Sequence, residues 1–424
     1  MDRNRLIAVL VGAFAISSKS VVAMHLFDNP HFYRASHFFA EPRFEKKELT
    51  SFDVMASRGA TKTARNAQGK KVDLLSIYGP ENRALLKPGT YTKTCATVEP
   101  GQAQYQKRSN LCLLDPSVTG SSCCQDLFIG KLHVVDVIFL ATQNILHGFF
   151  VQLHVPFRKI EISQVGSAEC CSCDSSACIP LSDAVQQLLA QQGLCLGDTE
   201  SKGVGEVSAY LGWAKNYQDT ERVDFVDTTL KVGIVAPTGS VRNEDSLFSI
   251  PTGYNRFTGA SIGADVSVGA YQWLTVGAHL RTIIFAAAQR SVRMNTSPCG
   301  TGFIRLAFGA ARIKPGALYE TGLYVKADHI FRGLSLLAGY SYVGKGHDGL
   351  TPCVSGIVPS VAGNDQALQP WTMQTVHYLI EYDFTKQKRF MCPRLSLYCD
   401  QQISGKRVFD ADMTGVGFGM EVSW

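Results

Sequence analysis

Apolar residues alternate with small or polar residues over unusually long stretches, and this alternation constrains the fold of the chain more than any other feature. In GASIGADVSVGA (259–270), Ala, Ile and Val occupy every second position, with Gly, Ser and Asp between them. The alternation resumes in LTVGAHLR (274–281) after a link of three residues. A period of two places the two sets on opposite faces of a strand. We therefore predict a hairpin of two long antiparallel strands.

The same alternation recurs from about residue 49 to the end of the chain. Strands are predicted at about residues 50–60, 126–141, 146–160, 205–217, 223–236, 256–270, 274–292, 313–328, 333–346, 369–384, 391–402 and 409–424. Their connections alternate between long segments, above all 61–125 and 161–204, and short links of three to six residues. Membrane β-barrels have this asymmetry, with long loops on one side and short turns on the other. An even number of strands places both chain ends on the short-turn side.

An exported β-sandwich would show the same period, but three features favour a barrel. Several predicted strands exceed ten residues, whereas strands of soluble proteins usually have about 5–6. The polar face is rich in Gly and Ser, and charged residues make up 18% of the chain, against about 25% in soluble domains. Aromatic residues that could form interfacial girdles collect near strand ends: Tyr271, Trp273, Phe331, Trp371, Phe384 and Trp424. We predict an all-β fold, a transmembrane antiparallel β-barrel of about 12 strands within a range of about 10–14.

The N-terminal residues have the pattern of a secretory signal peptide. Arg3 and Arg5 precede an apolar run over residues 6–16, and small residues end the segment at Ala23. We expect residues 1–23 to be the signal peptide, 24–48 to be a periplasmic segment or a plug, and 49–424 to be the barrel. One short helix is predicted in a long loop at 180–193, where Ser182 can cap its start and Gly193 its end.

The chain resembles Gram-negative outer-membrane β-barrel proteins through its signal peptide, its alternating strands and its last strand, TGVGFGMEVSW. The resemblance implies that the C-terminal strand is an assembly signal read by the barrel-assembly machinery, through Val416, Phe418, Met420, Val422 and Trp424. GIVAPTGS (233–240) also resembles strands of long-chain fatty acid and aromatic-hydrocarbon transport barrels. Those channels typically have 14 strands and an N-terminal plug, whereas 12 strands are predicted here. The resemblance implies residence in the outer membrane, with its lipid as a partner.

Thirteen cysteines follow the predicted signal peptide. In an exported protein, cysteines in long loops are expected to form disulfides rather than a metal site, and CCSCDSSAC (170–178) lacks paired C-x-x-C knuckles. The disulfide candidates are Cys95, Cys112, Cys123, Cys124, Cys170, Cys171, Cys173, Cys178 and Cys195. Their connectivity does not follow from the sequence. No metal or cofactor is expected.

Strand parity predicts which charged residues face the barrel interior. The predicted lumen-lining residues are Glu206, Asp227, Lys231, Asp265, His279, Arg281, Glu320, Lys326, Asp328, His377, Glu381 and Asp383. Acidic residues prevail, which indicates a weak preference for cations, although a salt-bridged network that fills the barrel would have the same composition. A barrel of about 12 strands lies between filled 8-stranded and open 16-stranded cases.

The sequence leaves three functions open. The leading hypothesis is passive passage of small solutes through a porin-like channel, and the alternative is a structural or surface-contact protein whose loops bind partners. The third is an outer-membrane hydrolase, for which GHDG places His347 and Asp348 at a strand edge. The chain has no Walker or H-E-x-x-H motif, so we expect no enzyme. Basic residues do not run together as nucleic-acid binding requires, and the oligomeric state stays open.

Overall fold

The computed structural model describes residues 49–79, 81–82, 124–171, 189–218, 223–271, 273–296, 302–331, 333–384, 391–410 and 412–423. The predicted signal peptide, the 24–48 segment and Trp424 lie outside these ranges, as do Cys95, Cys112, Cys123, Cys173 and Cys178. Of the predicted helix at 180–193, residues 189–193 are described: 189–191 are helical, and 192–193 form a turn. No helix of the described part of the chain is long and apolar enough to cross a membrane.

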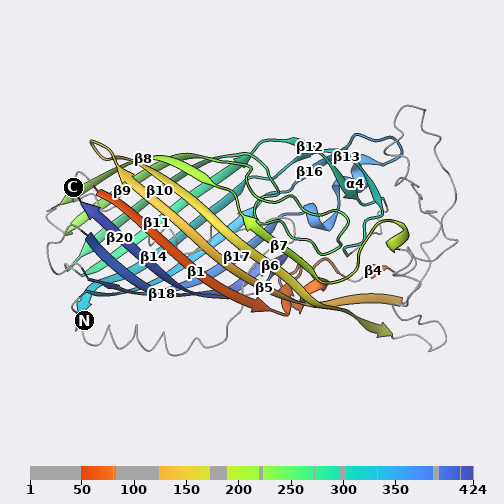
Figure 1. The fold of residues 1–424 in the computed structure, drawn as a ribbon, viewed down its shortest axis with the longest axis horizontal. Coiled ribbons are helices and arrows are strands. Elements are labelled where there is room, and N and C mark those ends of the chain that lie inside the picture. Colours follow the sequence, from red (N-terminus) through yellow and green to blue (C-terminus); the bar gives the residue numbers. More distant parts are fainter. Residues whose placement is uncertain are drawn as a thin grey trace.

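Twelve antiparallel strands form a closed barrel, as predicted (Figure 1). They are β1 (Leu49–Thr61), β5 (Cys124–Asn144), β6 (Phe149–Cys171), β8 (Ser208–Gln218), β9 (Phe225–Val235), β10 (Gly259–Ala270), β11 (Leu274–Phe285), β14 (Leu318–Phe331), β15 (Leu334–Lys345), β17 (Trp371–Asp383), β18 (Met391–Lys406) and β20 (Met413–Ser423). The first strand closes the barrel because β1 pairs with both β5 and β20. Closure leaves the wall without an exposed edge.

The period of two in the sequence becomes an inside and an outside in the barrel. On β9, Leu230, Val232 and Ile234 point outward and are more than half exposed, whereas Thr229 points inward and is buried. The outward set is apolar in strand after strand, and it includes Leu280, Leu323, Leu397 and Val416. An apolar outer wall around a polar interior is the arrangement that a lipid bilayer requires.

The two ends of the barrel differ. At one end, β1 begins where β20 ends, with Leu49 in register with Ser423, and the connections between strands are short (Figure 1, left). At the other end the loops build further structure. One sheet contains β12 (Ala288–Met294), β13 (Ala307–Lys314) and β16 (Gly349–Pro352), and a second contains β2 (Thr63–Arg65), β3 (Lys71–Asp73) and β19 (Val408–Phe409). The loop end also carries β4 (Glu81–Asn82), β7 (Thr199–Val204), the helix α4 (Pro359–Gly363) and the 3-10 turns η2 (Leu74–Ser76) and η4 (Gln366–Leu368).

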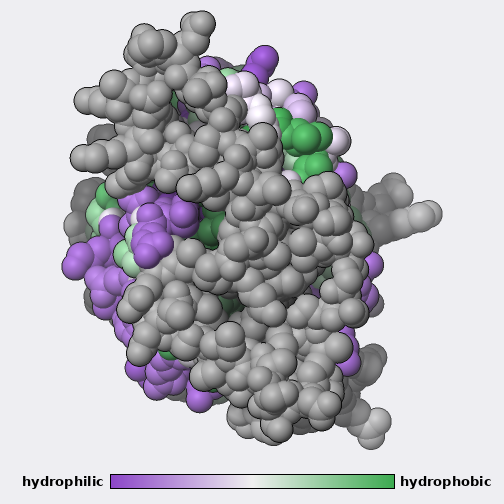
Figure 2. Space-filling model, turned by 90° about the vertical axis from the view of Figure 1, so that its right-hand side faces the viewer, coloured by the Kyte–Doolittle hydropathy of each residue, from purple (hydrophilic) through white to green (hydrophobic). Residues whose placement is uncertain are grey.

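The long loops share an apolar core with the loop-side ends of the strands, and we call this assembly the loop cap. Its central cluster contains a chain of ring contacts in which Tyr78 meets Phe303 at 5.0 Å, Phe303 meets Phe248 at 5.2 Å and Phe248 meets Phe128 at 5.3 Å between centroids. In the view onto this end, the described side chains that reach the surface are mainly hydrophilic (Figure 2). The cap is therefore organised like a small globular domain, with an apolar centre and a polar exterior.

Two predicted strands were too long, and one aromatic residue was misplaced. The 274–292 strand is β11, which ends at Phe285, followed by β12, which leaves the barrel wall to pair with β13. The 313–328 strand likewise divides into β13 and β14. β13 alternates between buried and less buried positions as a wall strand does, so the period alone does not separate it from the wall. Trp371 belongs to no girdle: it faces inward at the loop end of β17 and is 1% exposed in the cap core.

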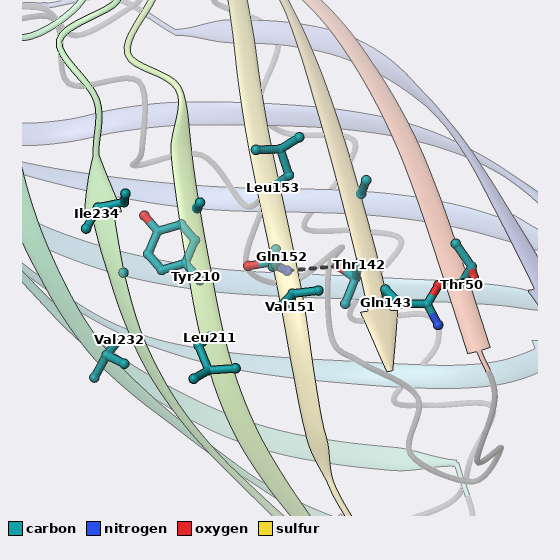
Figure 3. A pocket seen from close by; sticks show the side chains of 13 residues that line it. Thr50, Thr142, Gln143, Val151, Gln152, Leu153, Tyr210, Leu211, Val232 and Ile234 are labelled. Carbon is teal, nitrogen blue, oxygen red and sulfur yellow. Dashed lines mark hydrogen bonds between the residues drawn. The ribbon is translucent and has the colours of Figure 1, made fainter. Parts of the chain in front are cut away.

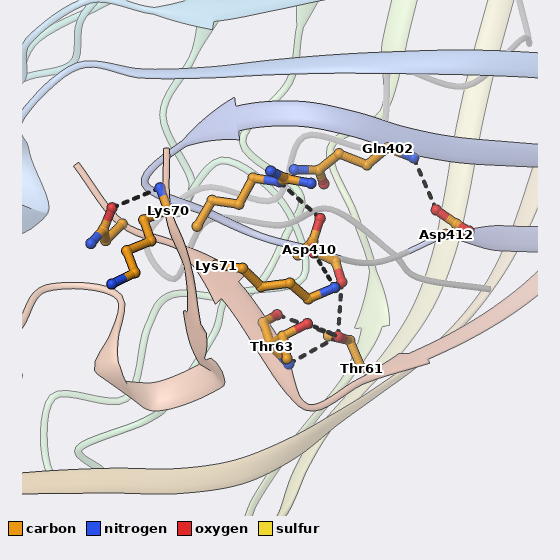
Figure 4. A network of polar contacts seen from close by, with 9 residues as sticks. Thr61, Thr63, Lys70, Lys71, Gln402, Asp410 and Asp412 are labelled. Atoms are coloured by element: carbon orange, nitrogen blue, oxygen red, sulfur yellow. Dashed lines mark hydrogen bonds and ion pairs between the residues drawn. The ribbon is translucent and has the colours of Figure 1, made fainter. Parts of the chain in front are cut away.

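A buried carboxylate joins the cap to the first and last strands of the barrel. The Asp410 carboxylate accepts a hydrogen bond from Arg65 at 2.9 Å and forms an ion pair with Lys71 at 2.7 Å. The Thr61 hydroxyl donates to the backbone oxygen of Asp410 at 2.8 Å (Figure 4). Nearby, the Asp412 carboxylate accepts a hydrogen bond from the backbone amide of Gln402 at 2.9 Å. These contacts fix the β19–β2–β3 sheet over the seam between β1 and β20.

Candidate functional site

The barrel interior contains most of the ionisable side chains of the wall. Eleven of the twelve predicted lumen-lining residues lie on barrel strands, and all eleven point inward by the alternation of buried and exposed positions. The twelfth, Glu206, lies in the connection between β7 and β8 and is fully buried. The site is therefore a polar surface spread around the wall rather than one localised cluster.

Neighbouring strands pair many of these charges with one another. Lys231 on β9 contacts Asp265 on β10 at 3.1 Å. Glu320 on β14 accepts from Arg281 at 2.6 Å and contacts the His279 imidazole at 3.1 Å, both on β11. These contacts cross from strand to strand at adjacent register positions, so they brace the wall and neutralise part of the interior charge.

Other predicted residues lie apart from those pairs. Lys326 contacts Asp328 on its own strand at 2.9 Å, and Asp227 accepts from the Asn216 amide at 2.5 Å. Glu381 and Asp383 lie at the short-turn end of β17, where both are buried. The structure thus distributes the twelve residues over several heights of the barrel.

Glu206 is held against the 237–257 loop on the loop side of β8. Gly239 and Gly253 approach its carboxylate so closely that a β-carbon at Gly253 would lie 1.3 Å from Oε2. Its Oε1 accepts from the Arg256 backbone amide at 3.4 Å. Burial is the main reason that the pKa of Glu206 rises to about 7, against the lowering effect of the backbone hydrogen bonds.

Sequence reasoning missed an ion-pair cluster at the closing seam, which we call the seam cluster. Arg394 on β18 contacts Asp53 on β1 at 2.9 Å and Glu421 on β20 at 3.4 Å, and all three side chains are buried. To reach Asp53, the guanidinium passes over β20 at Gly419, where a β-carbon would lie 2.3 Å from the Asp53 carboxylate. The alternating glycines of the last strand were the available signal.

Aromatic rings lie flat over inward glycines of the neighbouring strand elsewhere in the wall. A β-carbon at the glycine would lie 2.0–2.4 Å from the ring that covers it in five pairs: Phe150 over Gly212, Tyr210 over Gly233, Phe225 over Gly269, Tyr324 over Gly277 and Tyr398 over Gly415. Glycine is required at these positions because any side chain would displace the ring. Rings that follow the wall occupy less of the interior than rings that project across it.

Three further interior residues form a hydrogen-bonded chain across β15, β17 and β18. The Ser341 hydroxyl lies 2.7 Å from Nε2 of His377, and Nδ1 of His377 lies 2.8 Å from the Asp400 carboxylate. All three are buried. His377 was predicted to line the interior, whereas Ser341 and Asp400 were missed because they lie 36 positions before and 23 positions after it in sequence.

The outer wall has a groove of about 640 Å³ over β5, β6, β8 and β9, near the short-turn end (Figure 3). Val151, Leu153, Leu211, Val232 and Ile234 border it, all on the outward face. Small outward residues, Ala141 and Ala209, lie between them. The exposed part of its lining is mainly apolar, and the inward residues Thr142, Gln152 and Tyr210 also contribute to it.

Those predicted loop cysteines that the structure describes lie, like the GHDG motif, at the loop end of the barrel. Cys195 has a free, exposed thiol among the described residues, so its predicted disulfide is not formed here. The β5–β6 register places Cys124 opposite Cys171 and Gln125 opposite Cys170. At the rim, His347 is exposed, whereas Asp348 is buried, contacts Lys345 at 2.8 Å and accepts from the Gly316 amide at 2.7 Å. The structure therefore does not make a His–Asp pair from GHDG.

The fold is that of an outer-membrane β-barrel. Among solved structures, the chain is similar to an outer-membrane channel from Pseudomonas putida F1, with 13% identity, a TM-score of 0.47, and 90% of this chain and 99% of that chain covered. It is also similar to the translocator domain of the autotransporter NalP from Neisseria meningitidis, with 9% identity, a TM-score of 0.34 and 90% of each chain covered. A FadL homologue from Pseudomonas aeruginosa has 9% identity and a TM-score of 0.29, with 96% of this chain and 99% of that chain covered.

No family model matches the chain, and no curated protein matches it. At identities this low, the structural likeness concerns the architecture of the barrel.

Proposed function

We propose that the protein is a channel of the bacterial outer membrane through which small polar solutes pass passively. The observation that carries the proposal is the closed barrel with an apolar outward face and a charged inward face.

The interior charges favour cations over anions. Carboxylates outnumber basic groups on the inward faces of the barrel strands: Asp53, Asp136, Asp227, Asp265, Glu320, Asp328, Glu381, Asp383, Asp400 and Glu421 against Arg158, Lys231, Arg281, Lys326, Lys345 and Arg394. Fixed negative charge in a narrow passage of low dielectric constant concentrates counter-ions. The selectivity is therefore expected to be weak, since several carboxylates already have partners.

Conductance of the refolded full-length protein in planar bilayers tests this function. We expect stepwise currents and, in a KCl gradient, a reversal potential with the sign of cation selectivity. Glu381→Gln combined with Asp383→Asn removes two inward charges at the short-turn end and should shift the reversal potential toward zero. Lys159→Gln, on the outward face near the loop end, is the matched control and should leave it unchanged. Folded protein that inserts and passes no current contradicts the proposal.

The loop cap favours a second candidate function, adhesion or partner binding on the cell surface. Membrane barrels commonly have long loops at their outer end, and in this chain those loops build two additional sheets and an aromatic core. Binding of fluorescent protein to host or bacterial cell surfaces, compared with protein whose cap has been removed by protease, tests this candidate. Equal binding after removal of the cap contradicts it.

We further propose that the last strand directs assembly. Val416 and Phe418 are outward and about half exposed, and they share their face with Met420 and Val422. Deletion of Trp424 is expected to reduce the folded fraction in cells more than it alters conductance of the molecules that fold. The ratio of folded to unfolded protein on heat-modifiable gels measures this.

A further inference from the structure

We infer that Ser341, His377 and Asp400 form a serine-hydrolase site inside the barrel, with a small ester as substrate. A nucleophile, a base and a group that orients the base define such a site by geometry, whatever the fold or the chain order. The distances of 2.7 Å from the Ser341 hydroxyl to Nε2 and 2.8 Å from Nδ1 to the Asp400 carboxylate satisfy both links. This activity is independent of the proposed channel.

The order of contacts sets the role of each group. A carboxylate accepts the Nδ1–H of His377, which leaves Nε2 as the acceptor for the Ser341 proton. The three strands fix the arrangement: His377 is the direct register partner of Asp400 on β18, and it is diagonal to Ser341 on β15. Asp400 acts through His377 and is therefore a positioning residue.

A second, independent observation points to a ligand at the same place. Thr375 is the register partner of both Ser341 and Gln402, so the three lie in one row across β15, β17 and β18. Among the described residues, Thr375 Oγ1, both side-chain polar atoms of Gln402 and Oδ2 of Asp400 are buried and have no hydrogen-bond partner. Such atoms are rare in folded proteins and call for a partner. The Thr375 hydroxyl and the Gln402 amide can donate to an oxyanion beside Ser341.

The surroundings limit the substrate to a small molecule with a short apolar acyl group. On the short-turn side, Leu337, Leu379 and Tyr398 form an apolar layer inside the barrel. On the loop side, Val343 and Met373 belong to the apolar core of the cap. The polar row thus lies between two apolar layers, which favours a substrate whose polar centre is an ester and whose acyl chain is hydrocarbon.

The chemistry is ester hydrolysis with water as the second reactant. Ser341 Oγ bonds to the ester carbonyl carbon while its proton moves to Nε2 of His377, and the developing oxyanion is held by Thr375 and Gln402. The bond to the leaving oxygen then breaks, and the proton on Nε2 passes to the alcohol. Water attacks the acyl-serine with His377 as base, which releases the carboxylic acid and restores the Ser341 hydroxyl.

Covalent labelling of the wild-type protein provides a test that needs no variant. Full-length refolded protein in detergent is treated with a fluorophosphonate, and modified peptides are identified by mass spectrometry. We expect the adduct on Ser341 and none on Ser335, an inward, buried serine of the same strand. Protein that was unfolded before treatment should not be labelled, because the triad is then dispersed.

Hydrolysis of p-nitrophenyl butyrate completes the test. Ser341→Ala and His377→Gln should each lower kcat by about 10²-fold or more, while Ser335→Ala retains the wild-type rate. Asp400→Asn should lower kcat with little change in KM, and it should slow labelling of Ser341. Folded protein without a Ser341 adduct, or a folded Ser341→Ala variant that hydrolyses the ester at the wild-type rate, overturns the inference. Single-channel conductance of Ser341→Ala should match the wild type, so failure of the channel proposal would be seen separately.

Discussion

The barrel wall and the loop cap reach their stability by different routes. In the wall, ladder hydrogen bonds fix every strand between two neighbours, and side chains mostly adjust to that frame, as Arg394 does by passing over Gly419. In the cap, short strands and loops have few ladder bonds, and apolar contacts such as Phe248 with Phe303 hold them together. Loss of one side chain should therefore act locally in the cap and globally at the closing seam.

The largest expected effect comes from Arg394→Ala in the seam cluster. The change leaves Asp53 and Glu421 buried without their shared cation, which costs about 3–5 kcal/mol where a buried pair loses one partner. We expect a lower urea midpoint for the whole barrel, measured by heat-modifiable gel migration. Lys231→Ala, whose partner Asp265 is 30% exposed, is the matched control and should have a much smaller effect.

Removing an arginine from a buried ion pair in the cap tests whether the cap and the barrel wall are independent. Arg305 forms a buried ion pair with Asp365 between two cap loops. Arg305→Ala should expose the cap to protease while the barrel still migrates as a folded form. If Arg305→Ala unfolded the barrel as Arg394→Ala does, the proposed independence of wall and cap would be wrong.

The next effect in size concerns the aromatic core of the cap. Phe248→Ala removes the ring that contacts both Phe128 and Phe303, and deletion of a buried Phe costs about 3 kcal/mol or more. We expect faster tryptic cleavage of the cap with an unchanged urea midpoint for the barrel. Val241→Ala, a half-exposed position in the same loop, should leave the cleavage rate unchanged.

The sequence predicts the barrel wall but not the core of the loop cap. The wall could be predicted, because a period of two reports the inward and outward faces directly, and the inward placement of Lys231 or Glu381 needs nothing more. Ser341 with Asp400 could not be predicted, because their meeting depends on the register of three strands. The cap core was missed because Tyr78, Phe248 and Phe303 come from three loops with no shared period.

Glu206 gives a smaller effect that depends on pH. Its pKa rises from 4.5 in the unfolded chain to about 7 in the fold, mainly through burial. The folded state therefore binds the proton more tightly, so its contribution to stability is fully present below about pH 4.5 and is lost as pH rises to about 7. At about 1.4 kcal/mol per unit of pKa, the difference is on the order of 3 kcal/mol.

This contribution should appear in the 237–257 loop, which packs against Glu206. Hydrogen exchange of the Arg256 amide measured between pH 5 and pH 8, after correction for the intrinsic rate, should show weaker protection at the higher pH. Glu206→Gln should remove that trend, since glutamine stays neutral throughout. A trend that persists in the variant would assign the pH dependence to another group.

The smallest effect is expected where wall and cap meet at Asp410. Lys71 is 54% exposed, so its contact with Asp410 is screened by water, and Lys71→Ala should change stability by less than about 1 kcal/mol. Arg65 is 21% exposed and donates a hydrogen bond to the same carboxylate, so Arg65→Ala should cost more. Differential protease sensitivity of the β2–β3 segment measures both. If Lys71→Ala destabilised the segment more than Arg65→Ala, the stability of this junction would depend on the number of charges around Asp410. Buried hydrogen-bond geometry would then not explain the difference between wall and cap.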